Sequence, residues 1–381
     1  MLQCMNYKSS PNDHRERVED HLANLKLRDR DAVLTQEGLI FRVYGYWHPS
    51  KAYVCDVEYA PASIFRSEDP RAIRQKEKQI YYKFYQDQGL QFVQEKYPQH
   101  TVWHTPLQTR LVGVHLNQIT ETRRPDKATQ KLLATQPHDS LLRVMQTLSD
   151  LIFERTELSE SNFGVFGSIL HGFYHPQYSD LDFIIYGGKE LRRLRETLET
   201  LYKERSSHIR NEFETEDAVK EKAKRWKFVN YSPREYCWHQ QRKAIYAVFQ
   251  DEEQDRFIKT EFEPVKEWSE ILNECNSKTR ILKKGWIKAV ARITDDCDAA
   301  FMPSLYQVEV NRVLEGPKTD DIKRIVSYVE EFRMQAERDE EVYVEGNLEQ
   351  VVTSAKTFHQ ITLTYGPRYY EQVLKVARLP S

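Results

Sequence analysis

The chain has few of the features that mark secreted, membrane-bound or metal-stapled proteins. Its five cysteines are scattered without a paired spacing, which argues against a disulfide framework or a zinc ribbon and favours a reducing compartment. No stretch approaches the roughly 18 apolar residues that a membrane span requires, and the polar first residues lack the apolar core of a signal peptide. We therefore expect a cytoplasmic protein with no membrane partner.

An excess of charge of either sign is also missing. The 381 residues carry a formal net charge of −2, although 30% of them are charged. No global basic field draws such a protein toward nucleic acid, so any surface for that partner must be local. The length suffices for two or three domains with real hydrophobic cores.

The chain does contain a compact polar motif between apolar segments. Gly167 and Ser168 are followed, after eleven residues, by Asp180, Leu181 and Asp182. Side chains alternate between the two faces of a strand, so Asp180 and Asp182 are expected to project together while Leu181 faces the core. A carboxylate pair of this kind can coordinate two hard cations, which bridge phosphate oxygens and activate an attacking hydroxyl.

The residues before the acidic pair predict a cradle for phosphate. Residues 162–166 have the pattern of a short strand that ends at Gly167, where the backbone can turn tightly and approach a ligand. Ser168 then opens a short helix, which makes its hydroxyl and the free N–H groups of the first turn available to a triphosphate. Ser179, directly before the acidic pair, is a further candidate contact to the nucleotide.

Residues 163–186 resemble the nucleotidyltransferase superfamily typified by DNA polymerase beta. The resemblance is strongest to its minimal branch, in which Gly-Ser precedes Ser-Asp-x-Asp and an apolar residue. It implies transfer of a nucleoside monophosphate (NMP) from a nucleoside triphosphate (NTP) to an acceptor hydroxyl. Asp180 and Asp182 would hold two magnesium (Mg²⁺) or manganese (Mn²⁺) ions, and Gly167 and Ser168 would hold the β and γ phosphates.

The superfamily requires a third carboxylate from a neighbouring strand. Residues 242–249 and 256–265 are predicted to form a hairpin joined by an acidic turn. In its second strand Glu261 and Glu263 share a face with Lys259, so either glutamate can complete the metal site and orient the attacking oxygen. The superfamily usually places an aspartate inside an apolar run there, and two surface glutamates that balance Lys259 explain the pattern equally well. The second explanation describes a nucleic-acid-binding protein that has kept the fold and lost catalysis.

A basic cluster interleaved with aromatic residues follows the motif. Its four candidate contacts to nucleic acid are Lys222, Lys224, Arg225 and Lys227. Phosphate attraction combined with base stacking uses these residue types together. A solvated helix face over an aromatic core has the same sequence pattern, so both interpretations stay open.

The hydrophobic pattern divides the chain into three regions and predicts an α+β fold. Residues 1–135 form an N-terminal α+β module, with an amphipathic helix expected over 72–85 and a hydrophilic linker over 121–127. Residues 136–275 form the nucleotidyltransferase domain, a mixed sheet backed by helices. Residues 276–381 carry many short strands with Gly and Pro between them, which predicts a small β-barrel-like module. The oligonucleotide-binding barrel is one fold of this kind.

A looser set of motifs spreads over the whole chain. These motifs lie at residues 28–31, 37–41, 48–49, 167–168 and 301–306. They are similar to a group of prokaryotic proteins described only as nucleotidyltransferase-domain proteins, which implies the three-part layout but no substrate. The flanking β modules favour RNA as the acceptor, in particular a structured RNA such as tRNA, with DNA second. A hydroxyl on a partner protein is the alternative that the minimal branch allows.

Overall fold

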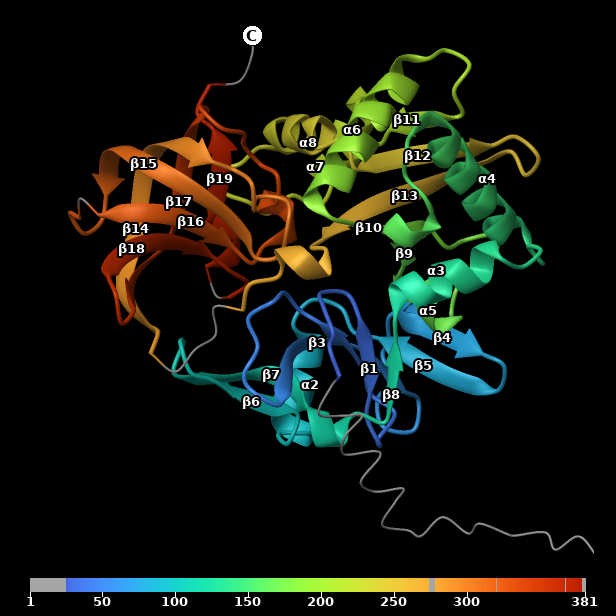
Figure 1. Ribbon diagram of the computed structural model, residues 1–381, viewed down its shortest axis with the longest axis horizontal. Helices are drawn as coiled ribbons and strands as arrows, with labels where there is room; N and C mark the ends of the chain where they lie inside the picture. The colour runs from blue at the N-terminus through green and yellow to red at the C-terminus, as the bar shows by residue number, and fades with distance from the viewer. Residues whose placement is uncertain (1–24, 274–277, 320, 367, 379–381) are drawn as a thin grey trace, which may run out of the picture.

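The computed structural model describes residues 25–273, 278–319, 321–366 and 368–378, and it contains three sheets (Figure 1). One sheet falls within each of the segments 1–135, 136–275 and 276–381. In Figure 1 the N-terminal sheet lies below, and the other two stand side by side above it. The predicted α+β class is confirmed.

The N-terminal module is an eight-stranded sheet with one helix against it. Its elements are β1 (Ala32–Leu34), β2 (Ile40–Val43), β3 (Ala52–Pro61), β4 (Ile73–Lys76), β5 (Gln79–Lys83), α2 (Gln88–Lys96), β6 (Thr101–His104), β7 (Thr109–His115) and β8 (Glu121–Arg123). The long strand β3 joins both halves, because one of its ends pairs with β7 and the other with β5. The hairpin of β4 and β5 therefore projects from one side of the module.

Two sequence expectations in this module were wrong. The stretch 72–85 is the β4–β5 hairpin rather than a helix, with Glu77 in its turn at φ +51°. Tyr81 of the hairpin is buried against Phe173 of the middle domain, with ring centroids 4.9 Å apart, so a tertiary contact overrides the helical pattern. The expected linker 121–127 contains β8 and the start of a helix that packs on the middle sheet.

The middle domain is a five-stranded sheet in the order β11-β12-β13-β10-β9. Its elements are α3 (Pro125–Leu133), α4 (Ser140–Arg155), β9 (Phe163–Val165), α5 (Gly167–His171), β10 (Leu181–Tyr186), α6 (Gly188–Lys203), β11 (Ile209–Asn211), α7 (Glu216–Ala223), α8 (Pro233–Arg242), β12 (Tyr246–Asp251) and β13 (Arg256–Val265). The apolar sides of α4 and α6 pack into one core with β10 and β13. The predicted hairpin is β12 and β13, and β13 runs parallel to β10.

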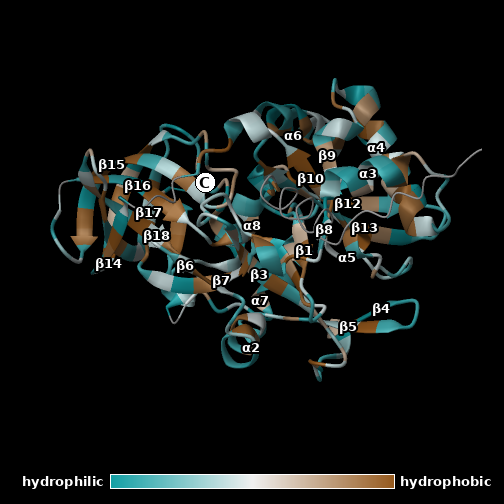
Figure 2. Ribbon diagram, turned by 60° about the horizontal axis from the view of Figure 1, so that its bottom comes forward, coloured by the Kyte–Doolittle hydropathy of each residue, from teal (hydrophilic) through white to brown (hydrophobic). Residues whose placement is uncertain are grey.

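The C-terminal module is a closed barrel. Its strands are β14 (Arg280–Asp295), β15 (Ser304–Glu315), β16 (Ile322–Ser327), β17 (Glu341–Val352), β18 (Thr357–Leu363) and β19 (Val373–Val376). Because β14 pairs with both β15 and β17, five strands close a ring in the order β14-β15-β16-β18-β17, and β19 extends it. Figure 2 shows hydrophobic and hydrophilic residues alternating along these strands, as a filled barrel requires. The predicted barrel is confirmed, and it has the five-stranded layout of the oligonucleotide-binding type.

The three modules meet at a buried ionic cluster, which we call the junction cluster. It joins Arg30 of the N-terminal module, Glu263 at the end of β13, and Glu330 and Arg333 of the barrel. Arg30 Nη2 lies 2.8 Å from Glu263 Oε2 and 2.8 Å from Glu330 Oε1. Arg333 Nη2 donates to Glu263 Oε1 at 3.0 Å. Losing one partner of a buried ion pair leaves an uncompensated charge, so this cluster links the three modules energetically.

The cysteines that the structure describes form no disulfide. Cys55, Cys237 and Cys297 are free thiols, while Cys4 and Cys275 lie outside the described residues. Within the ranges that the structure covers, no helix combines the length and the apolar character needed to cross a membrane.

Candidate active site

The Gly-Ser bend and the acidic pair lie against each other. Gly167 has φ +59°, and a Cβ atom built on it would stand only 2.6 Å from Asp182 Oδ2. Asp182 lies on β10, and Asp180 lies in the loop just before that strand begins. Leu181 and Phe183 are buried in the core, as the strand period predicts. A side chain at position 167 would therefore displace the carboxylate that the motif predicts as a metal ligand.

The predicted phosphate cradle has the expected local form. The strand β9 ends before the bend, and α5 begins at Gly167 and is closed by Gly172 in the left-handed conformation. Ser168 lies in the first turn of α5 and is half-buried. The hydroxyl of Ser179 accepts a hydrogen bond from the backbone N–H of His175 at 2.8 Å, so it shapes the loop that leads to the acids. Nucleotide binding by Ser168 and Ser179 stays a prediction.

The acidic pair has cations nearby but no direct ion-pair partner among the described residues. Within the described ranges, the carboxylates of Asp180 and Asp182 make no hydrogen bond and no ion pair. Burial raises the pKa of Asp182 to about 7; Lys83 opposes this rise and Asp180 adds to it. Burial also raises the pKa of Asp180, against the influence of Lys259. Two partly desolvated acids that no cation contacts directly fit a bound metal ion.

The parallel register of β10 and β13 decides which glutamate stands beside the acids. Asp182 is paired with Glu261, and Ile184 is paired with Glu263. Neighbouring residues in register point to the same side of a sheet, so Glu261 lies next to Asp182. Burial raises the pKa of Glu261 well above its usual range, and Glu263 adds to the rise. Glu261 is also 3.5 Å from Arg333, measured between Oε1 and Nη2.

Glu263 has a structural role instead. Burial tends to raise the pKa of this carboxyl, but Arg30 and Arg333 outweigh that effect and hold the pKa well below its usual range. The interpretation as two surface glutamates that balance Lys259 does not hold, because Glu263 is 3% exposed and Lys259 pairs with Glu212 at 2.6 Å. Glu263 thus belongs to the junction cluster, and Glu261 is the glutamate that stands beside the acidic pair.

The side chains of the predicted metal site are not gathered into a complete ligand set. Across the described part of the chain, no group of three or more His, Cys, Asp or Glu side chains is arranged to hold a metal ion. The pair Asp180 and Asp182 can supply two ligands, and Glu261 would have to leave Arg333 to supply a third. Binding of Mg²⁺ or Mn²⁺ stays a prediction.

Sequence reasoning missed a basic wall that the N-terminal module adds to the site. Lys83 is the strongest cationic influence on Asp182. Lys76 lies beside Gly172 at the end of α5, with its Cε atom 3.4 Å from where a Cβ of residue 172 would be. Arg123 lies 3.1 Å from His171 of α5, measured from Nη1 to Nδ1. The sequence feature that could have indicated these residues is the density of lysine and arginine in 71–83. The helix expected there gave no reason to place them near the acidic pair.

The basic cluster after the motif lies on α7 and the turn behind it. Its residues are Lys222, Lys224, Arg225 and Lys227. The Lys224 ammonium pairs with Glu221, and Lys222 lies 5.2 Å from the ring of Phe213. Trp226, in the same segment, packs on the buried ring of Tyr231. The aromatic residues thus pack on a core, as one interpretation held, while Trp226 and Phe228 stay partly exposed and the charged groups lie on the surface. Their contact with nucleic acid remains a prediction.

Comparison with known proteins agrees with this geometry. Residues 150–263 match the family described as "Nucleotidyltransferase domain". The match covers the Gly-Ser bend, the acidic pair and β13 up to Glu263, so the middle domain is a nucleotidyltransferase domain. The superfamily resemblance is confirmed.

A relative covers nearly the whole chain. It is an uncharacterized protein, MJ1086, of Methanocaldococcus jannaschii, with 24% identity over 358 residues, which is 93% of this chain and 100% of that protein. No solved structure matches the chain. The comparisons therefore give the class of the middle domain and support NMP transfer in general, without naming a substrate.

Proposed function

We propose that this protein is a metal-dependent nucleotidyltransferase that moves an NMP from an NTP to an acceptor hydroxyl and releases pyrophosphate. One observation carries the proposal: the Gly167 bend abuts the Asp182 carboxylate, and Glu261 stands next to it in the parallel register. This chemistry needs a bend that can hold polyphosphate and acids that can hold cations. In this protein the Gly167 bend lies directly against the Asp182 carboxylate.

The residues divide the reaction between them. The oxygen of the acceptor hydroxyl bonds to the α-phosphorus, and the bond from that phosphorus to the pyrophosphate oxygen breaks. Gly167 and Ser168 hold the β and γ phosphates, while Glu261 in its ionised form orients the attacking oxygen and accepts its proton. Mg²⁺ or Mn²⁺ held by Asp180 and Asp182 would neutralise phosphate charge and make the hydroxyl more nucleophilic.

RNA is the acceptor that we favour, a structured RNA such as tRNA first and DNA second. The proposal is supported by the barrel, whose layout is one that binds oligonucleotides in other proteins, and by the basic cluster on α7. A hydroxyl on a partner protein is the rival acceptor, in which case the protein would adenylylate that partner.

Transfer of a label tests the proposal. The protein is incubated with α-labelled NTPs, Mg²⁺ or Mn²⁺, and either total RNA or a protein extract. The test variant is Asp180→Ala/Asp182→Ala, and the matched control is Asp87→Ala/Asp150→Ala, which removes two exposed acids elsewhere. We expect labelled RNA with the wild type and the control, and none with the test variant. Labelled protein would identify the rival acceptor, and label that survives in the test variant would overturn the site.

A catalytically inactive nucleic-acid-binding protein is the second candidate. The contact of Arg333 with Glu261 favours it, because a bound arginine competes with a cation for the third carboxylate. NTP binding without transfer under any of these conditions would select this candidate.

A further inference from the structure

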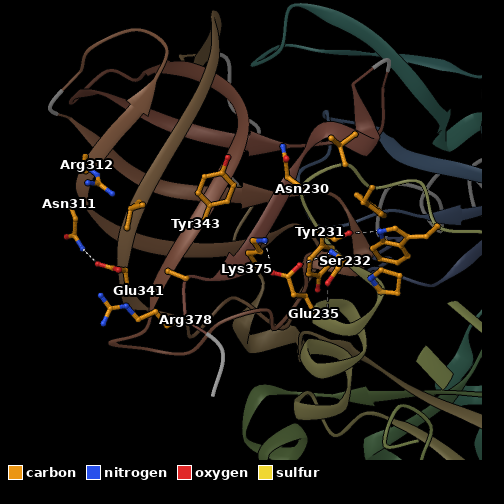
Figure 3. Close-up of a pocket in the computed structure, with 16 residues that line it drawn as sticks. Asn230, Tyr231, Ser232, Glu235, Asn311, Arg312, Glu341, Tyr343, Lys375 and Arg378 are labelled. Atoms are coloured by element: carbon orange, nitrogen blue, oxygen red, sulfur yellow. Dashed lines mark hydrogen bonds and ion pairs between the residues drawn. The ribbon is translucent and has the colours of Figure 1, made fainter. Parts of the chain in front are cut away.

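A groove runs along the outside of the barrel, away from the acidic pair, and we call it the barrel groove. It has a volume of about 950 Å³. One wall consists of outward-facing residues of β14, β15 and β17 and of β19 with the residues just after it, and the other is the segment 226–235 (Figure 3). A backbone hydrogen bond from Val229 N–H to the carbonyl of Tyr370, at 2.9 Å, ties that segment to the barrel. The groove is therefore a built feature of the domain junction.

Aromatic rings line the groove. Tyr343 stands in the middle of it in Figure 3, and its hydroxyl donates to Glu345 Oε2 at 3.0 Å, which fixes the ring. Trp226 and Phe228 belong to the opposite wall. The indole N–H of Trp226 donates to the carbonyl of Tyr231. Rings that are held in place in a polar groove can stack flat ligand groups at little cost in conformational entropy.

The charge left in the groove is positive. Lys375 pairs with Glu235 at 2.7 Å and the Asn311 amide donates to Glu341 at 2.9 Å, and the cations Arg312, Lys375 and Arg378 outnumber these two carboxylates. Arg312 and Arg378 are exposed, and neither guanidinium has a hydrogen bond or ion pair with any residue that the structure describes. Two unpaired guanidinium groups beside aromatic rings suit a chain of phosphates and bases.

The same segment connects the groove with the candidate active site. The groove wall begins at Trp226, which lies within the basic cluster just after α7. Glu221 of α7 acts electrostatically on Lys259, and Lys259 in turn acts on Asp180. The chain from α7 through the basic cluster therefore leads into the groove wall.

We propose that the barrel groove binds a single-stranded stretch of the nucleic acid whose end enters the active site. Bases stack on Tyr343 and Trp226, and phosphates contact Arg312 and Arg378. A single strand fits better than a duplex, whose bases are already stacked on one another. An acidic peptide would use the arginines but has no need of the rings. The inference rests on the proposed function only for the choice of acceptor class.

Fluorescence anisotropy with the full-length protein and a labelled 12-nucleotide RNA of mixed sequence tests the charge of the groove. The test variant is Arg312→Glu/Arg378→Glu. The control with matched charge is Arg205→Glu/Arg338→Glu, two exposed arginines outside the groove that also lack ion pairs among the described residues. We expect the test variant to bind the RNA at least about tenfold more weakly and the control to keep most of its affinity. The slope of log K against log salt concentration should fall by about two in the test variant, one for each lost phosphate contact. An equal loss in both variants would overturn the inference.

Substitutions of Tyr343 test stacking separately from folding. Tyr343→Phe keeps the ring and loses the hydrogen bond to Glu345, whereas Tyr343→Ala loses both. Stacking predicts near wild-type RNA affinity for the phenylalanine variant and a loss of about fivefold or more for the alanine variant. Equal weakening of both variants would show that the hydroxyl, and not stacking, matters.

Two further outcomes count against the inference. A duplex of the same length that binds more tightly than the single strand would overturn it, as would a poly-glutamate peptide that displaces the RNA at equal charge concentration.

NTP binding, measured by calorimetry without RNA, reports on the proposed function alone. A wild type that binds NTP but no single-stranded RNA refutes the groove, and one that binds RNA but no NTP refutes the active site.

Discussion

Replacing Glu263 with glutamine should destabilise the whole protein, because this residue joins all three modules. Its carboxylate is 3% exposed and contacts Arg30 at 2.8 Å and Arg333 at 3.0 Å. Both arginines are 1% exposed. The variant Glu263→Gln leaves these two buried cations without their shared anion. Breaking a buried ion pair from one side typically costs about 3–5 kcal/mol, so we expect a loss of about 3 kcal/mol or more.

Thermal unfolding followed by circular dichroism measures this loss. For cooperative units of roughly 150–250 residues, a loss of 3 kcal/mol lowers Tm by about 6–12 °C. The matched control is Glu309→Gln, which breaks a surface pair with Arg292 of 2.8 Å between groups that are 65% and 46% exposed. Surface pairs contribute about 0–1 kcal/mol, so Tm should change by at most a few degrees. Equal shifts in the two variants would refute the structural role of Glu263.

The pH dependence gives a second check on the same variant. The pKa of Glu263 is held below the usual glutamate value of 4.5, so the folded protein binds this proton less tightly than the unfolded chain does. The stability that Glu263 contributes is thus fully present above pH 4.5 and is lost as the pH falls through the lower, folded-state pKa. The difference in Tm between the wild type and Glu263→Gln should therefore narrow at low pH. A difference that grows on acidification would contradict the reasoning.

Three further predictions concern the candidate active site. Gly167→Ala places a Cβ 2.6 Å from Asp182 Oδ2 at φ +59° and should weaken NTP binding in calorimetry by about tenfold, whereas Gly366→Ala, with nothing within 4 Å, should bind normally. Asp182→Asn should be more stable than the wild type at pH 8, by at most about 4 kcal/mol in urea unfolding, and not at pH 4. The reason is that the pKa of the Asp182 carboxyl is raised from 3.8 to about 7, so the wild type loses stability as the pH rises from 3.8 to about 7. An equal stability difference between variant and wild type at pH 4 and pH 8 would contradict this reasoning. Lys83→Met removes the cation that lowers the pKa of Asp182 and should weaken NTP binding severalfold at unchanged Tm. An unchanged affinity would show that Lys83 does not act on the bound phosphates.

Local patterns were enough to find the bend, the acids and most of the strands. The alternation of buried and exposed residues predicts β10 and the barrel strands, since each strand has to fill one core with every second side chain. The adjacency of Gly167 and Asp182 also follows locally, because a short strand, a turn and a short helix leave the chain little choice of return path. The sequence by itself therefore determined the class of the middle domain.

Only the tertiary structure could decide between Glu261 and Glu263. The two residues have the same local pattern, and their difference comes from the register with β10 and from Arg30, which is 233 positions away in the chain. The hairpin at 72–85 likewise forms because Tyr81 packs on Phe173 of another module. Contacts between residues so far apart are set by how the modules dock, and no periodicity within a short window records them.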